Sequence, residues 1–133
     1  RIFEEKIMGK SRADIVMVLD GSLAGLEIKS DADTYDRLET QVKDYDKFCD
    51  YNYIVAGITH EKHVEEHVPE WWGILIVSEE EGKVKIVQKR EAGSGCGERN
   101  LTISLPETIF RHIRQRVRNL YRISCLRRLG KKN

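Results

Sequence analysis

Two short apolar runs joined by an Asp-Gly pair constrain the fold of this chain more than any other feature. The first run spans residues 13–19 and is rich in β-branched side chains, and the second spans residues 23–28. Asp20 and Gly21 lie between them, and such a pair favours a two-residue hairpin loop because both residues tolerate positive φ. The sequence therefore predicts an antiparallel hairpin closed by a type I′ turn.

Each of these predicted strands carries a carboxylate. With a two-residue loop, Leu19 faces Ser22, and the same register places Asp14 opposite Glu27. Facing carboxylates repel each other by about 0.2 to 1 kcal/mol at exposed sites and by more when desolvated. A hard cation such as Mg²⁺ or Mn²⁺, which prefers carboxylate and carbonyl oxygens, would offset this repulsion. A three-residue loop would instead pair Asp14 with Ile28 and separate the two carboxylates.

Lys29 lies two residues after Glu27 and therefore shares its face of the strand. Its ammonium could orient a metal-bound water or offset charge on an attacked phosphate. A cation held by Asp14 and Glu27, with the Ile28 carbonyl as a further ligand, would together with this lysine make a phosphodiester hydrolysis site. The alternative is a charged rim of the hairpin in which Lys29 only neutralises Glu27.

Helical and strand patterns follow the hairpin. Within residues 31–50, apolar and aromatic side chains recur at spacings of three and four, which predicts a helix with Ser30 or Asp31 as its N-cap. A short helix capped by Thr59 is predicted through His67. Further strands are predicted at residues 53–58, 73–77 and 83–88, the last two joined by a Glu-Glu-Gly turn at 80–82.

The end of the chain combines a glycine-rich stretch with a helix. Residues 91–100 hold three glycines and predict a mobile loop, and Pro106 opens a helix that runs to about Leu129. This order of elements predicts an α/β fold with a mixed central sheet flanked by helices. We expect a single domain over residues 1–133, with a core in 1–104 and a basic helix in 105–133.

Positive charge gathers in that last helix. The net charge is +1, yet residues 111–133 contain nine Lys/Arg and no Asp/Glu, which leaves 14 basic and 22 acidic residues before them. Such a helix could track a phosphate backbone with its basic residues, while its apolar stripe packs on the domain or a partner. We expect nucleic-acid contacts from five arginines, namely Arg12, Arg111, Arg114, Arg118 and Arg122.

Composition excludes several other classes. No apolar run approaches the roughly 18 residues of a membrane span, so no membrane role is expected. The three cysteines lie far apart without C-x-x-C spacing, which argues against a disulfide framework and favours the cytoplasm. Three histidines, His60, His63 and His67, have a spacing that could hold zinc, but the interleaved charged residues favour an exposed helix face. Trp71 and Trp72 could stack on bases, but core packing is favoured.

The hairpin motif resembles a known nuclease superfamily. Asp14 on one strand, followed by Glu27-Ile28-Lys29 on the next, is similar to the PD-(D/E)XK pattern, with alanine at the position of the nominal proline. Gln41 and Tyr45 add a Q-x-x-x-Y spacing on one helix face, similar to the extra motif of the RecB and λ-exonuclease branch. Without the hairpin motif, these two residues would be a surface amide and a core aromatic.

Longer segments resemble a small family of bacterial and phage nuclease-like proteins with little assigned function. They are S-R-A-D-I-V at residues 11–16, E-I-K-S-D at 27–31 and P-E-W-W-G-I at 69–74. This resemblance covers roughly residues 2–77. Members usually have a helical stretch before the position of Arg1, and the absence of an initial Met agrees with a natural chain that begins upstream.

The resemblance implies a restriction-endonuclease-like core and a Mg²⁺- or Mn²⁺-dependent deoxyribonuclease. The catalytic set would be Asp14, Glu27, Lys29, Gln41 and Tyr45, with the metal held by Asp14, Glu27 and Ile28. The superfamily often adds an acidic residue from its first helix, and Glu4 and Glu5 are both candidates for it.

Two other functions also fit the sequence. The first is a catalytically idle nuclease fold that binds nucleic acid through its basic tail. The second is a protein-interaction module of phage or mobile-element origin, which would use the apolar side of the last helix to dimerise or to engage a host protein. A homodimer would also suit an enzyme that cuts both strands of DNA.

Overall fold

The computed structural model describes residues 1–93 and 104–130, and beyond residue 120 it describes only the backbone and the side chain of Arg122. Most of the loop predicted at residues 91–100 lies outside these ranges. Within them, no helix is long and apolar enough to cross a membrane.

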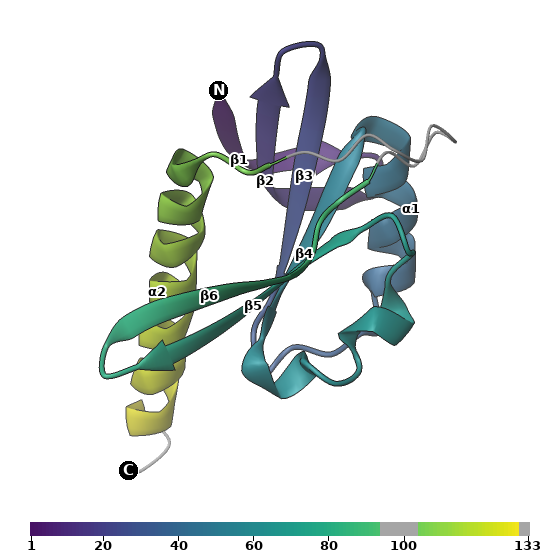
Figure 1. Ribbon diagram of the computed structural model, residues 1–133. Helices are drawn as coiled ribbons and strands as arrows, with labels where there is room; N and C mark the ends of the chain where they lie inside the picture. The colour runs from purple at the N-terminus through teal and green to yellow at the C-terminus, as the bar shows by residue number, and fades with distance from the viewer. Residues whose placement is uncertain (94–103, 131–133) are drawn as a thin grey trace.

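One six-stranded sheet with the strands in chain order forms the centre of the fold (Figure 1). Its strands are β1 (Ile2–Met8), β2 (Ser11–Leu19), β3 (Ser22–Lys29), β4 (Tyr51–Gly57), β5 (Gly73–Glu80) and β6 (Lys83–Arg90). The β3–β4 and β4–β5 pairs are parallel and the other pairs are antiparallel. The predicted α/β class with a mixed central sheet and flanking helices is confirmed.

The predicted hairpin has the predicted register from Leu19↔Ser22 to Ile15↔Leu26, but the predicted pair of Asp14 and Glu27 is not part of the ladder. Leu19 pairs with Ser22 and Ile15 pairs with Leu26, so the loop between β2 and β3 has two residues. The predicted type I′ conformation is wrong, because positive φ occurs at Gly21 (78°) and not at Asp20. The loop between β5 and β6 has positive φ at both of its residues, Glu81 and Gly82.

The first strand was missed by the sequence patterns. Residues Ile2–Met8 form β1, an edge strand paired with β2 from Ile2↔Met17 to Met8↔Ser11. Apolar and polar residues do not alternate through this segment, and Glu5 interrupts the extended backbone with φ 53°. The segment therefore lacks the alternation of apolar and polar residues by which a half-buried strand is predicted.

Helices cover both faces of the sheet. Helix α2 (Glu107–Gly130), close to its predicted limits, packs Ile109, Ile113 and Val117 against a cluster that includes Ile15 and Leu26. Helix α1 (Leu38–Phe48) contributes to a second cluster, which contains Leu38, Tyr45, Ile54 and the fully buried Trp72. These large apolar contacts fix the two helices on opposite sides of the sheet.

Helix α1 begins later than predicted. Its N-cap is Arg37, without a side-chain cap, and neither Ser30 nor Asp31 caps it. Asp33 Oδ2 instead accepts a 2.7 Å hydrogen bond from the Ser30 N–H, and Asp31 Oδ1 accepts one of 3.1 Å from the Thr59 N–H. The local Ser30–Asp33 bond competes with helix formation, and the long-range Asp31–Thr59 bond holds the segment, so residues 30–37 form a connection.

The segment between β4 and β5 also differs from its prediction. Two short 3₁₀ helices, η1 (Ile58–His60) and η2 (Val64–His67), replace the single helix expected after Thr59. The expectation of an exposed histidine face is wrong for His60, which is only 9% exposed. Trp72 lies in the core as predicted, whereas Trp71 is 41% exposed.

Candidate functional site

Asp14 lies where β2 and β3 separate. Their regular pairing ends at Ile15↔Leu26, and the Ile28 N–H then donates a 2.8 Å hydrogen bond to Asp14 Oδ2. The carboxylate of Asp14 thus takes the place of a backbone carbonyl in the ladder and reaches the space between the strands.

Tyr45 of α1 joins the two carboxylate-bearing strands. Its hydroxyl lies 2.6 Å from Glu27 Oε2 and 3.0 Å from the Leu26 carbonyl, and it accepts a 3.2 Å hydrogen bond from the Asp14 N–H. The Tyr45 side chain is fully buried, so these bonds are shielded from water. The same helix therefore fixes the position of Glu27 and the backbone at Asp14.

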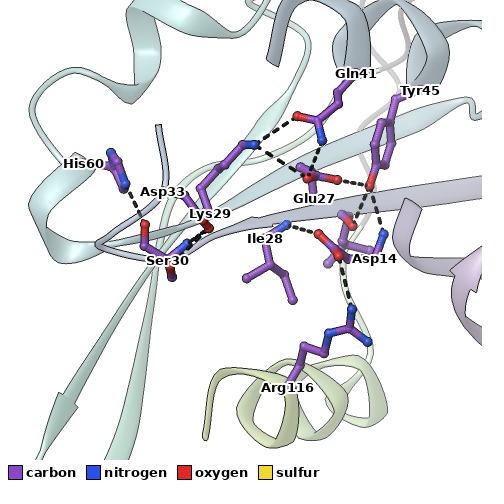
Figure 2. A network of polar contacts seen from close by, with 11 residues as sticks. Asp14, Glu27, Ile28, Lys29, Ser30, Asp33, Gln41, Tyr45, His60 and Arg116 are labelled. Atoms are coloured by element: carbon purple, nitrogen blue, oxygen red, sulfur yellow. Dashed lines mark hydrogen bonds and ion pairs between the residues drawn. The ribbon is translucent and has the colours of Figure 1, made fainter. Parts of the chain in front are cut away.

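A buried amide connects Glu27 to Lys29. Gln41 Nε2 donates a 3.0 Å hydrogen bond to Glu27 Oε1, and Lys29 Nζ donates one of 3.0 Å to Gln41 Oε1. Lys29 Nζ also lies 3.9 Å from Glu27 Oε1, and the two residues are only 5% and 4% exposed. Figure 2 shows the five predicted catalytic residues in one network. Their predicted roles are not tested by this placement and stay predictions.

Burial controls the charge of the carboxylate pair. Desolvation, followed by the charge of Asp14, raises the pKa of Glu27 from its ordinary 4.5 to about 8. Desolvation also raises the pKa of Asp14, against the lowering effects of the Ile28 N–H and Arg116. Without a cation, Glu27 is therefore largely protonated at neutral pH, which reduces the repulsion between the two groups.

An arginine from α2 reaches the site, although the sequence reasoning did not select it. Arg116 Nη2 lies 3.2 Å from Asp14 Oδ1 (Figure 2). It also lies 3.2 Å from Glu5 Oε1. A signal was available, because Arg116 lies three residues after Ile113 and next to Val117, within the apolar stripe of the helix. Glu5 of β1 is linked to Asp14 through Arg116, while the catalytic role expected for Glu4 or Glu5 stays a prediction.

The five arginines predicted to contact nucleic acid do not gather at the site. Arg111, Arg118 and Arg122 are exposed on α2, and Arg114 Nη1 pairs with Glu107 Oε1 at 3.3 Å. Only Arg12 lines a pocket that also contains the carboxylate pair. That pocket has a volume of about 700 Å³ and is also lined by Lys10, Arg37, Thr40 and Gln41, among others.

The donor set of the site suits some cations and not others. Among the described residues there is no group of three or more His, Cys, Asp or Glu that could hold a metal. Two carboxylates with a main-chain carbonyl would still suit Mg²⁺ or Mn²⁺, since Mg²⁺ keeps several waters and is commonly bound through one or two carboxylates. They do not suit a closed structural zinc site.

The three histidines do not converge on a common point. His60 Nδ1 lies 2.7 Å from the Tyr35 hydroxyl, and His60 Nε2 lies 2.8 Å from the Ser30 carbonyl. His67 stacks on the Tyr35 ring at 3.8 Å between centroids, whereas His63 Nδ1 lies 3.5 Å from Glu66 Oε1. His60 and His67 thus contact the same tyrosine, whereas His63 contacts a glutamate.

Comparison with known proteins corrects the family suggested by the motifs. A family model described as Bacteriophage P4 protein cII matches residues 1–131. No curated protein and no solved structure matches the chain. The predicted membership of the PD-(D/E)XK nuclease superfamily is therefore wrong, because the model that spans nearly the whole chain describes a phage protein and not a nuclease of that group. The five motif positions were too few to identify a family.

The match supports the phage origin that we gave with the alternative functions, and it favours those alternatives over the nuclease prediction. The mixed α/β architecture is shown by the structure and does not depend on this match. A restriction-endonuclease-like core is not confirmed.

Proposed function

Because the chain belongs to the bacteriophage P4 protein cII family, whose name states no activity, we propose a function from the site alone, namely cation-dependent hydrolysis of phosphodiester bonds in DNA. The observation that carries this proposal is the partly buried Asp14, with a side chain 22% exposed, beside the buried Glu27 and Lys29. Burying a carboxylate and an ammonium opposes folding unless they are paired, and such groups gather at functional sites.

The proposal assigns each residue a task. Asp14 and Glu27 would hold Mg²⁺ or Mn²⁺ with the Ile28 carbonyl, and the cation would supply Lewis acidity and a more acidic water. Lys29 would bring positive charge to the attacked phosphate, and its 3.0 Å bond to Gln41 fixes its direction. Tyr45 would position Glu27 through its 2.6 Å contact.

We also propose that β1, β2, β3, α1 and β4 form a restriction-endonuclease-like core. The partner would be DNA in the cytoplasm, and the protein would act as a homodimer where both strands are cut. The order of these elements puts the carboxylates on neighbouring strands and the supporting amide and phenol on the helix that follows.

A nuclease assay on single-stranded, linear and supercoiled DNA with Mg²⁺ or Mn²⁺ tests the proposal. Asp14→Asn and Lys29→Ala should each lower activity by about 10²-fold or more, because each removes charge from the reacting centre. Lys43→Ala is the matched control, since the Lys43 side chain is 76% exposed on α1. The proposal fails if the parent cuts no DNA form, or if the cleavage seen is equal in Asp14→Asn.

A second candidate is a non-catalytic phage module that binds nucleic acid or protein. The family match favours it, and so does the Arg116–Asp14 ion pair, which occupies a carboxylate that a cation would need. DNA binding that persists in Glu27→Ala, from a parent without activity, would support nucleic-acid binding. Salt-insensitive association without DNA binding would instead support a protein partner.

A further inference from the structure

The pocket over the carboxylate pair has cations on its walls. Lys10 and Arg12 come from the β1–β2 connection and the start of β2, and Arg37 comes from the N-cap of α1. All three side chains are exposed, and no ion pair within residues 1–93 and 104–130 includes any of them. Their charges are therefore available to a ligand.

The acidic residues that line this pocket are Asp14 and Glu27. Arg116 pairs with Asp14 at 3.2 Å, and Lys29 lies 3.9 Å from Glu27. These two cations therefore offset much of the negative charge of the two carboxylates. The exposed cations of the walls then give the mouth of the pocket an excess of positive charge. Such a mouth attracts anions and excludes acidic partners.

The two walls are tied together. Ser11 lies between Lys10 and Arg12, and its hydroxyl donates a 2.6 Å hydrogen bond to Asp44 Oδ2 of α1. A Cβ added at Gly9 would lie 2.7 Å from Asp44 Oδ1, so the β1–β2 connection lies close to α1, and the φ of +58° at Gly9 favours glycine there. The backbone that carries Lys10 and Arg12 is thus held next to α1, the helix whose N-cap is Arg37.

We propose that this pocket is the strand-binding channel of the site, in which Lys10, Arg12 and Arg37 bind phosphates of a single nucleic-acid strand. Its volume of about 700 Å³ lies within the range of ligand pockets, and Thr40 and Gln41 add polar groups to the lining. The inference rests on the proposed function for the reaction that follows binding, but binding itself needs no divalent cation.

This channel replaces the exposed face of α2 as the main nucleic-acid contact. Helix α2 packs on the opposite side of the sheet from α1 through Ile109, Ile113 and Val117 (Figure 1). Arg111 and Arg118 are exposed on that helix, whereas the pocket lies beside the first turns of α1. Phosphates bound in the channel would lie next to the carboxylates, and phosphates bound along α2 would not.

Fluorescence anisotropy with a short labelled single-stranded oligonucleotide in EDTA tests the channel without hydrolysis. Arg12→Ala, Arg37→Ala and Lys10→Ala should each weaken binding about threefold to tenfold. Each should also reduce the slope of log K against log salt by about 0.7, as for one lost phosphate contact to a single strand. Lys62→Ala, at an exposed lysine between the two 3₁₀ helices and outside the pocket lining, is the control and should change neither quantity. Arg118→Ala tests the rival contact along α2.

Each outcome decides between the two proposals. Binding that depends on the channel cations in a protein without nuclease activity would support the channel and refute hydrolysis. Nuclease activity with binding that is insensitive to Arg12→Ala and Arg37→Ala, or sensitive only to Arg118→Ala, would refute the channel. A parent that binds no oligonucleotide would also overturn it. Because the substituted side chains are exposed, circular dichroism should show unchanged folding in every variant.

Discussion

Replacing Glu27 with glutamine should make the cation-free protein more stable at alkaline pH. The pKa of Glu27 is about 8 in the folded chain, against an ordinary value of 4.5, because the carboxyl group is buried beside Asp14. Where a folded-state pKa is raised in this way, the protonated group contributes stability that is fully present below about pH 4.5 and is lost as the pH rises through about 8. The free energy of unfolding should therefore fall by about 1.4 kcal/mol per pH unit across this window, up to about 5 kcal/mol in total.

Urea denaturation in EDTA, followed by tryptophan fluorescence between about pH 5 and pH 9, measures this dependence. In Glu27→Gln the slope should largely disappear, because the amide has no proton to lose. Glu39→Gln is the matched control, since the Glu39 side chain is 86% exposed on α1, and it should keep the parental slope. A parent whose stability is flat or rises between about pH 5 and pH 8 would refute the reasoning, as would an unchanged slope in Glu27→Gln.

Three further substitutions test the packing and charge of the site. Tyr45→Phe should lower the free energy of unfolding by about 1 to 3 kcal/mol, because a buried carboxylate oxygen and a backbone N–H lose their partner; equal midpoints in urea would contradict this. Gly73→Ala should be less stable by about 1 to 3 kcal/mol because its Cβ would overlap a tyrosine ring, whereas Gly93→Ala, with nothing within 4 Å, should melt like the parent. Arg116→Ala should tighten Mn²⁺ binding, measured by calorimetry, about tenfold, because it frees the Asp14 oxygen that the guanidinium holds at 3.2 Å. Arg118→Ala should leave Mn²⁺ binding unchanged. Weaker Mn²⁺ binding in Arg116→Ala would refute the competition between the arginine and the metal.

Much of the candidate site could be predicted because its geometry is local. Asp14 and Glu27 meet through a two-residue loop only a few positions away from each, so the register follows from the strand patterns and the loop length. Gln41 and Tyr45 share a helix face because they are four residues apart. The register of a hairpin with a short loop and the periodicity of a helix both depend on residues close together in the chain, so both can be predicted from the sequence.

The elements that were missed depend on distant contacts or on small energy differences. The β1 strand has no regular alternation, and it is ordered by pairing with β2. The start of α1 was displaced by side-chain bonds such as that from Ser30 to Asp33, which are comparable in energy with a helix cap. The family was also misjudged, because a handful of motif residues describes a local arrangement and not the ancestry of a whole chain.

The sequence by itself determined the hairpin, the helix that supports it and the mixed α/β class, since periodicity and turn chemistry act between near neighbours. Only the tertiary structure brought Glu5 and Arg116 to Asp14. Glu5 and Arg116 are 111 positions apart, and they meet at Asp14 because α2 folds across the sheet to bury its apolar stripe. A side chain brought into place by the burial of its neighbours leaves only a weak trace in the local pattern, here an arginine between Ile113 and Val117 of the apolar stripe.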